Sequence, residues 1–310
     1  MREKLPGSLL ARRAEANYSN SGGPPVSRWL APGHHGARPL AVKPSHVDWL
    51  RDTGQRVKTA SGHEVEVWSF NHSDDPALLS AWATHFRQQY VVDGQLPALV
   101  AGTGMAHPQY VREVIFPDGK VAPGPSTRSG DFAEILVADY IEFVLGYWCP
   151  RDRYKGRFNR NDSTKGADIV GFRFINSAGV NVADELFVVE AKSGMTATAA
   201  NRLQDAVTDS RKDALREAMT LNALKQRMLD RGEMVGVTRV QRFQNEADTP
   251  FVRFNGAAAV LDEKVLATTD LAAVDANAHV NAGRLRLIVI RGAGMMDLVH
   301  ALYERAADEA

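Results

Sequence analysis

The fold is decided by residues 168–192, which read DIVGFRFINSAGVNVADELFVVEAK. Two runs within this stretch, 168–175 and 185–192, are rich in β-branched and aromatic residues and predict two strands. Asp168 opens the first strand, and the second stays apolar until Glu190. Because side chains alternate across a strand, Glu190 and Lys192 project to one face while Ala191 turns away. Two carboxylates and one ammonium group are therefore expected to converge.

A helix predicted over residues 131–147 supplies a third carboxylate. At about 100° per residue, its apolar side chains form one broad arc, and Glu134 falls inside that arc. Asp131, Asp139 and Glu142 fall on the opposite face, where the pattern predicts ordinary solvated charges. A carboxylate on a core face is costly unless a cation or hydrogen bonds meet it. Glu134 is therefore either a site residue or a buried partner of an arginine.

The remaining elements predict an α/β protein in two parts. Residues 117–130 collect prolines and glycines, which places a boundary near 126. Residues 1–126 are predicted to hold a basic, irregular segment to about residue 60, a strand over His63–Phe70, and a helix that starts at Asp74-Asp75-Pro76. Residues 127–310 are predicted to continue with a long helix over about 197–231, strands at 235–243, 251–254, 257–261 and 285–290, and a helix over Met295–Glu304.

The charge balance and the single cysteine exclude several classes of protein. The 310 residues hold 37 basic and 37 acidic side chains, so no global positive field exists and nucleic-acid affinity requires local patches or a partner. Cys149 cannot form an internal disulfide, and the N-terminus lacks a secretory signal, which predicts a cytoplasmic protein. Apolar runs are far shorter than the roughly 20 residues of a membrane helix, so no membrane insertion is expected.

These residue types fit the hydrolysis of a phosphodiester. The reaction needs charge neutralisation on the phosphate and a hydroxide-like nucleophile, and Mg²⁺ or Mn²⁺ held by hard oxygen ligands supplies both. Asp168 and Glu190 are the expected main ligands, the carbonyl of Ala191 adds another oxygen, and Glu134 is expected to hold a second ion or a metal-bound water. Lys192 is expected to orient the attacking water and to stabilise developing negative charge.

Two other triplets have similar letters but a poorer context. Pro117-Asp118-Gly119-Lys120 lies in a turn-rich stretch without a strand. Asp262-Glu263-Lys264 follows an apolar run, yet it lacks both an upstream acid that opens a strand and an acid on the core face of a helix. The predicted order of helix, strand and strand around Glu134, Asp168 and Glu190 favours this site over the two other triplets.

With these residues, the segment Ser129–Arg231 resembles the PD-(D/E)XK nuclease superfamily, whose core is a restriction-endonuclease-like mixed sheet flanked by helices. On that pattern Glu134, Asp168, Glu190 and Lys192 take the four active-site positions, although no proline precedes Asp168. The phrases 129–134, 166–168 and 190–193 also resemble the HamA nuclease subunit of Hachiman anti-phage defence. That resemblance implies a role in defence together with a helicase partner.

A basic loop leads into Asp168 and is the predicted contact with nucleic acid. Arginines and lysines there are expected on phosphates, and the interleaved rings of Tyr154 and Phe158 are available for stacking. The six basic residues are Arg151, Arg153, Lys155, Arg157, Arg160 and Lys165. A solvated surface loop is the alternative. Gln204, in the next helix, either faces the site or is an exposed helix residue.

The leading hypothesis is a magnesium-dependent DNA nuclease, and two alternatives stay open. One is a catalytically silent subunit that grips nucleic acid or a helicase, and the other is an RNase toxin on the same fold. The histidines lack the paired spacing of a zinc site, and no phosphate-binding loop of a nucleotide hydrolase occurs. The sequence does not decide whether the substrate is DNA or RNA, whether it is single- or double-stranded, or whether cleavage occurs at ends or internally. It also leaves open whether the chain forms a homo-oligomer.

Overall fold

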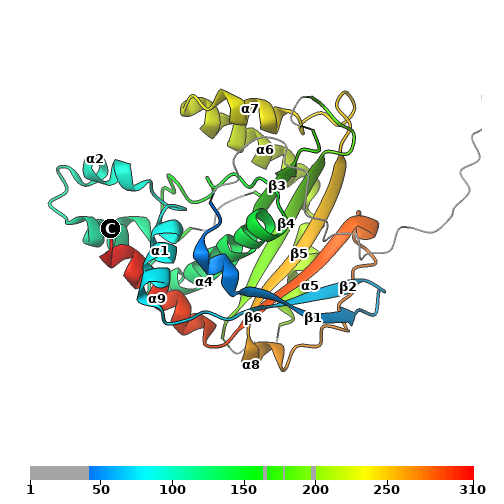
Figure 1. The fold of residues 1–310 in the computed structure, drawn as a ribbon, viewed down its shortest axis with the longest axis horizontal. Coiled ribbons are helices and arrows are strands. Elements are labelled where there is room, and N and C mark those ends of the chain that lie inside the picture. The colour runs from blue at the N-terminus through cyan, green and yellow to red at the C-terminus, as the bar shows by residue number, and fades with distance from the viewer. Residues whose placement is uncertain (1–41, 163–165, 177–178, 197–199) are drawn as a thin grey trace, which may run out of the picture. The chain divides into compact units, whose positions relative to one another are not determined.

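A six-stranded mixed β-sheet with helices on both faces is the framework of the computed structural model, which describes residues 42–162, 166–176, 179–196 and 200–310 (Figure 1). The strand order is β1-β2-β6-β5-β4-β3, antiparallel at the two edges and parallel in the middle. The strands are β1 Leu50–Lys58, β2 Glu64–Phe70, β3 Ile169–Arg173, β4 Glu185–Gly194, β5 Val252–Asp262 and β6 Leu285–Gly292. The predicted mixed sheet flanked by helices is confirmed.

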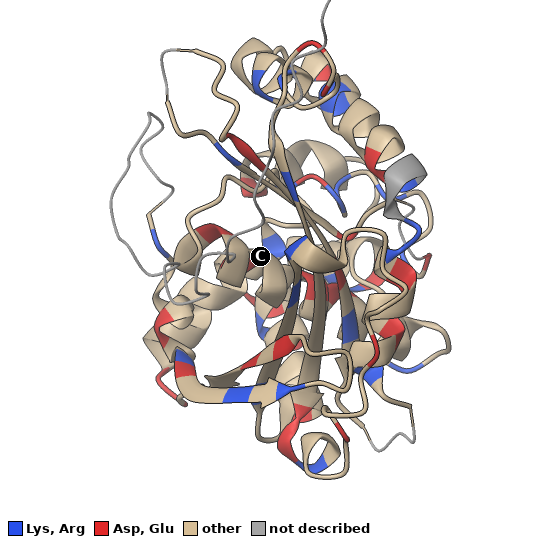
Figure 2. Ribbon diagram, turned by 90° about the vertical axis from the view of Figure 1, so that its right-hand side faces the viewer, with Lys and Arg blue, Asp and Glu red and all other residues tan. Residues whose placement is uncertain are grey.

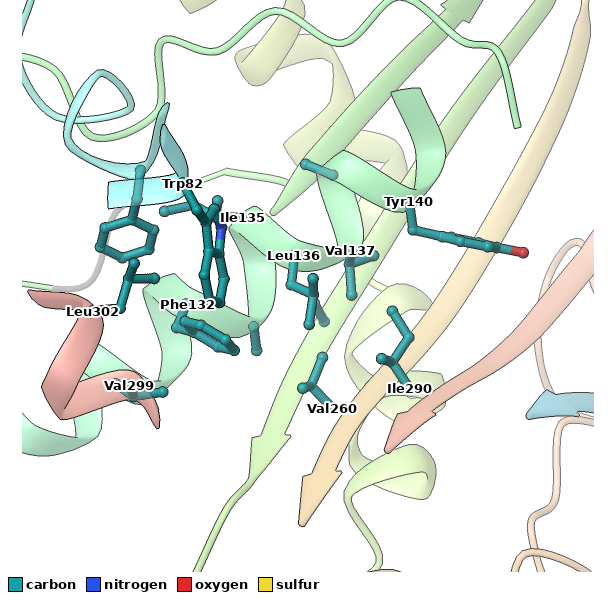
Figure 3. Close-up of a cluster of buried hydrophobic side chains, with 14 of the residues drawn as sticks. Trp82, Phe132, Ile135, Leu136, Val137, Tyr140, Val260, Ile290, Val299 and Leu302 are labelled. Atoms are coloured by element: carbon teal, nitrogen blue, oxygen red, sulfur yellow. The ribbon is translucent and has the colours of Figure 1, made fainter. Parts of the chain in front are cut away.

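Each face of the sheet has its own group of helices. On one face α4 (Gly124–Asp139) packs with α1 (Pro76–Arg87) and α9 (Met295–Asp308), around a core that includes Trp82 and Phe132 (Figure 3). The other face is covered by α5 (Arg202–Ser210), α6 (Asp213–Asp230) and α7 (Met234–Gln241). Shorter helical segments are the 3₁₀ turns Ser45–Trp49, Asp93–Gln95 and Ala282–Arg284, the helices α2 Leu96–Val100, α3 His107–Tyr110 and α8 Glu263–Leu266, and the π-helical turns Val111–Ile115 and Tyr140–Val144.

Strand β4 divides its side chains between the two cores as the alternation predicts. Phe187, Val189 and Ala191 pack in the core around α4. Leu186 and Val188 pack in the core that α6 and α7 cover. Since residues 190 and 192 follow the same alternation, their side chains leave the strand on the side opposite Ala191. This part of the prediction is confirmed.

Most of the other predicted elements are also confirmed. The strand predicted over His63–Phe70 is β2, and the helix predicted after Asp75 is α1, where the Asp75 side chain accepts hydrogen bonds from the Ala77 and Leu78 backbone N–H groups. The strands predicted at 168–175, 185–192 and 285–290 are β3, β4 and β6, and the last helix is α9. The predicted strands 251–254 and 257–261 form one strand, β5.

Two predictions on the far face of the sheet are wrong. The strand predicted at 235–243 is helix α7, because Val237 and Val240 lie three residues apart and are buried with Met228 of α6 in one core. Packing therefore overrides the β propensity of valine. The long helix predicted over 197–231 is two helices, α5 and α6, which are separated at residues 211–212.

Two further differences concern the first half of the chain. Strand β1 lies in the stretch predicted to be irregular, because its side chains are mostly exposed and show no apolar alternation. The proline- and glycine-rich stretch 117–130 contains the start of α4. Pro125 is tolerated in the first turn of this helix, because a backbone N–H at that place would have no partner within the helix. The domain boundary near residue 126 stays a prediction. In the structure, strands from both sides of that residue belong to one sheet.

Gly124 at the start of α4 gives a stability prediction with a matched control. A Cβ atom at residue 124 would lie 2.2 Å from the carbonyl oxygen of Asp118, whereas a Cβ at Gly130 would meet nothing within 4 Å. Gly124→Ala is expected to lower the free energy of unfolding by about 1–3 kcal/mol. Gly130→Ala, in the same helix, is expected to raise it by about 0.5–1 kcal/mol. Chemical denaturation of both variants checks this, and equal effects would contradict it.

Candidate active site

The four residues predicted to form the site line one cavity of about 780 Å³ beside the ends of β3 and β4. Glu134 reaches it from α4, Asp168 stands directly before β3, and Glu190 and Lys192 lie in the C-terminal half of β4. Because β3 and β4 are antiparallel with Ile169 opposite Val189 as the last pair of the ladder, Asp168 and Glu190 are the next residues beyond that pair on the two chain segments. The sheet register therefore brings these two carboxylates side by side.

Asp168 is largely buried and is held by the backbone of the neighbouring strand. Its Oδ2 accepts a hydrogen bond from the Ala191 backbone N–H at 3.0 Å, which ties the start of β3 to the end of β4. Burial, together with repulsion by the Glu134 and Glu190 carboxylates, raises the pKa of Asp168 well above its ordinary value. A group of carboxylates this close needs positive charge to remain ionised.

Lys192 is held by acids on both sides. Its Nζ donates to Glu190 Oε1 at 2.7 Å and lies 2.9 Å from Asp209 Oδ2 of α5. Burial alone would lower the pKa of Lys192, but the hydrogen bonds to Glu190 and Asp209 raise it above the ordinary value, so the ammonium stays charged. Asp209 was not among the predicted site residues, since in the sequence it is one of many acids in a helix of mixed charge.

Arg153 lies between two of the site carboxylates. Its Nε donates to Glu134 Oε2 at 2.6 Å and its Nη2 to Asp168 Oδ1 at 2.7 Å. Its Nη1 donates to the carbonyl of Ala167 at 2.6 Å, and the Tyr154 hydroxyl donates to the same Glu134 oxygen. Glu134 therefore fits both interpretations: it lines the cavity as a site residue would, and it is also the partner of an arginine.

The basic loop runs beside α4 and pairs with the acids of that helix. Arg157 bonds to Asp131 with both terminal nitrogens, at 2.8 and 2.9 Å, and Arg151 bonds to Asp139 at 2.9 Å. Further along, Arg160 bonds to Asp118 at 2.6 Å, and Lys155 lies 3.4 Å from Asp152. Along the ribbon as a whole, acidic and basic residues are interspersed (Figure 2).

This pairing corrects one prediction and limits another. Asp131 and Asp139 were expected to be solvated, yet their exposed fractions are only 4% and 0%, because α4 is covered on more than one side. The loop arginines satisfy their charge within the protein, so contact with nucleic acid would require them to exchange partners. That contact stays a prediction, and Lys165 lies outside the described residues. Of the two rings, Tyr154 is buried and Phe158 is fully exposed.

Other candidates have structural roles. The Gln204 side chain bonds to the backbone of Asp275 at 3.1 and 2.8 Å and is not among the residues that line the cavity. Asp118 accepts from the Lys120 and Val121 backbone N–H groups in a turn. Asp262 caps α8 and accepts from the Met295 N–H. The two rival triplets are thus accounted for by local structure.

A second group of polar side chains lies at the other end of α4. His46, His85 and Asp139 offer ligand atoms within 4.8 Å of one another, which is close enough to share a metal ion. His46 Nε2 lies 2.8 Å and His85 Nε2 3.1 Å from the Asp139 carboxylate. Arg151 also bonds to Asp139, so this carboxylate already has a cationic partner. The sequence did not indicate this group, because residues 46, 85 and 139 have no regular spacing.

The cavity fits a hard divalent cation better than this second group does. Glu134, Asp168 and Glu190 offer carboxylate oxygens, the ligand type that Mg²⁺ and Mn²⁺ prefer. Their mutual repulsion is relieved by any cation placed among them. Among the described residues, those that line the cavity include the cations Lys192, Arg202 and Arg216, and Arg216 Nη1 lies 3.8 Å from Glu190 Oε2. The arrangement can therefore bind both a cation and an anion.

Comparisons with known proteins place the chain in a family. A family model described as HamA matches residues 44–306, which is most of the chain. A search of curated proteins finds no significant match. Among the described residues, no helix is both long and apolar enough to cross a membrane. The chain belongs to the HamA family, the HamA subunit of Hachiman anti-phage defence.

Proposed function

We propose that this chain is a Mg²⁺- or Mn²⁺-dependent nuclease with a PD-(D/E)XK core, which hydrolyses phosphodiester bonds of DNA as the effector of Hachiman defence and works with a helicase partner. The observation that carries the proposal is that Glu134, Asp168, Glu190 and Lys192 line one cavity. Membership of the HamA family supports the defence role. The helicase partner rests on the resemblance to that family.

The residues of the cavity have different proposed roles in hydrolysis. Asp168, Glu190 and the Ala191 carbonyl would hold the metal ion, with Glu134 as a further ligand or as the partner of a bound water. When bound, such an ion supplies a hydroxide-like nucleophile and neutralises charge on the phosphate. The Lys192 ammonium, fixed between Glu190 and Asp209, stabilises the negative charge that grows on the phosphate oxygens.

The experiment that tests this function uses the purified full-length chain. Linear DNA, circular DNA and RNA are each incubated with Mg²⁺, with Mn²⁺ and with a chelator, for the wild type and Glu190→Gln. We expect metal-dependent cleavage of DNA that Glu190→Gln abolishes. Cleavage of RNA alone would favour an RNase. Absence of cleavage of every substrate, also with the helicase present, would contradict the proposal and favour a nucleic-acid-binding subunit.

Arg216 of α6 gives a prediction about substrate binding. It lines the cavity and is about one-third exposed, so its guanidinium can meet a backbone phosphate. Arg216→Ala is expected to weaken DNA binding and to reduce the slope of log affinity against log salt by about one. Arg211→Ala is the control, because Arg211 is exposed and is not among the residues that line the cavity. Binding of a labelled DNA at several salt concentrations checks this, and equal slopes would contradict it.

A further inference from the structure

The guanidinium of Arg153 occupies the space between two carboxylates that the proposed function assigns to a metal ion. It donates to Glu134 Oε2 and to Asp168 Oδ1, so it uses one oxygen of each acid. A third donor, Nη1, is held by the Ala167 carbonyl. The side chain is only 15% exposed. This is a fixed internal ion pair, not a mobile surface arginine.

The chain on both sides of Arg153 is anchored as well. Arg151 is bonded to Asp139 and Glu142, and Arg157 is bonded to Asp131. The hydroxyl of Tyr154, the next residue, shares the Glu134 oxygen with Arg153. The loop therefore delivers the Arg153 side chain to one place along α4, and its charge is built into the architecture of the site.

The positive charge of Arg153 stabilises the two neighbouring carboxylates as a bound cation would. Glu134 and Asp168 place two carboxylates in one poorly solvated position, where they repel each other. A guanidinium between them relieves this repulsion, as a divalent ion would. An oxygen lone pair engaged by Arg153 is not available to a metal, and two cations at this distance repel each other.

We infer that Arg153 is a built-in competitor for the metal ion of this site. This inference rests on the proposed function and adds a regulatory property to it. In the metal-free protein Arg153 bridges Glu134 and Asp168 and holds the loop in place. Metal binding requires Arg153 to give up at least one of these carboxylates, which weakens the apparent metal affinity of the resting chain. The opposite role, in which Arg153 positions the acids for the metal, predicts the opposite sign of effect.

The test measures metal affinity directly, without cleavage. Mn²⁺ is titrated calorimetrically into the full-length wild type and Arg153→Gln, which keeps a hydrogen-bonding side chain but removes the charge. We expect Arg153→Gln to bind Mn²⁺ at least about tenfold more tightly, since a full positive charge within ion-pair distance is removed. Its melting temperature should also rise more on addition of Mn²⁺. Equal or weaker binding by Arg153→Gln would overturn the inference.

Three controls locate the effect. Arg157→Gln breaks a comparable pair, with Asp131, on the same loop but keeps the Arg153 bonds to Glu134 and Asp168, so its Mn²⁺ affinity should stay close to that of the wild type. Arg153→Lys keeps the charge and should stay close to the wild type. Introducing Glu190→Gln into the wild type and into Arg153→Gln should abolish the binding. If Glu190→Gln abolishes binding but Arg153→Gln does not tighten it, only the inference fails, and if no variant binds Mn²⁺, the proposed metal site itself fails.

A measurement on the wild type keeps the inference testable if Arg153→Gln does not fold. Amide hydrogen exchange of the full chain is recorded with and without Mn²⁺. Because metal binding takes an anchor away from the loop, peptides that cover residues 150–162 should exchange faster when Mn²⁺ is present. Exchange that is unchanged or slower there, under conditions where Mn²⁺ binds, would overturn the inference.

Discussion

Lys192→Ala is expected to lower the rate of DNA cleavage by about 10²- to 10³-fold or more, the usual effect of removing one group that stabilises transition-state charge. Lys192 lines the cavity and is fixed between Glu190 and Asp209, so its ammonium has one position from which to meet the phosphate. The fold should remain intact, because Lys192 is partly exposed and Glu190 keeps Arg216 as a cationic neighbour at 3.8 Å. Cleavage rate and circular dichroism are measured on the same preparation.

Lys212→Ala is the matched control for this variant. Lys212 bonds to the same carboxylate, Asp209, at 2.6 Å, but it is 58% exposed and is not among the residues that line the cavity. Its removal should leave the cleavage rate within about twofold of the wild type, since exposed pairs contribute little. Equal losses in the two variants would mean that the charge of Asp209, and not the ammonium of Lys192, governs activity.

Asp139→Ala is expected to have the largest effect on stability, a loss of about 3–5 kcal/mol in the free energy of unfolding. Asp139 is fully buried and accepts from His46, His85 and Arg151. Removing it leaves a buried guanidinium with one fewer counter-charge and two imidazoles without their common partner. Chemical denaturation at neutral pH measures the change.

The control for Asp139 is an exposed pair on an edge strand. Asp52 bonds to Arg56 on β1, and both side chains are 30% exposed, so Asp52→Ala should change the free energy of unfolding by at most about 1 kcal/mol. A loss below about 1 kcal/mol for Asp139→Ala would show that the His46, His85, Asp139 and Arg151 group does not stabilise the fold.

The part of the site that lies on strands could be predicted from the sequence. Alternation along residues 185–192 fixes which side chains share a face, and the antiparallel pairing of β3 with β4 follows from two short strands joined by a connection without a helix. These two rules bring Asp168 to Glu190 and place Lys192 beside them. Both rules depend on the pattern of neighbouring residues and not on distant parts of the chain.

The partners of α4 could not be predicted in this way. An amphipathic pattern assumes one buried face, but α4 meets the sheet, helix α1 and the basic loop, so Asp131 and Asp139 are buried although they lie opposite the apolar arc. The position of Arg153 depends on how a loop without regular structure crosses that helix. Helix α7 was likewise decided by its contact with α6, which valine propensity does not encode.

The position of a bound metal ion tests directly whether Asp168 and Glu190 form the metal site. Crystals of the full-length chain grown with Mn²⁺ allow the ion to be located by its anomalous scattering. We expect a peak within coordination distance of the Asp168 and Glu190 carboxylates, which disappears in Glu190→Gln. A peak at His46, His85 and Asp139, with none beside Asp168 and Glu190, would contradict it.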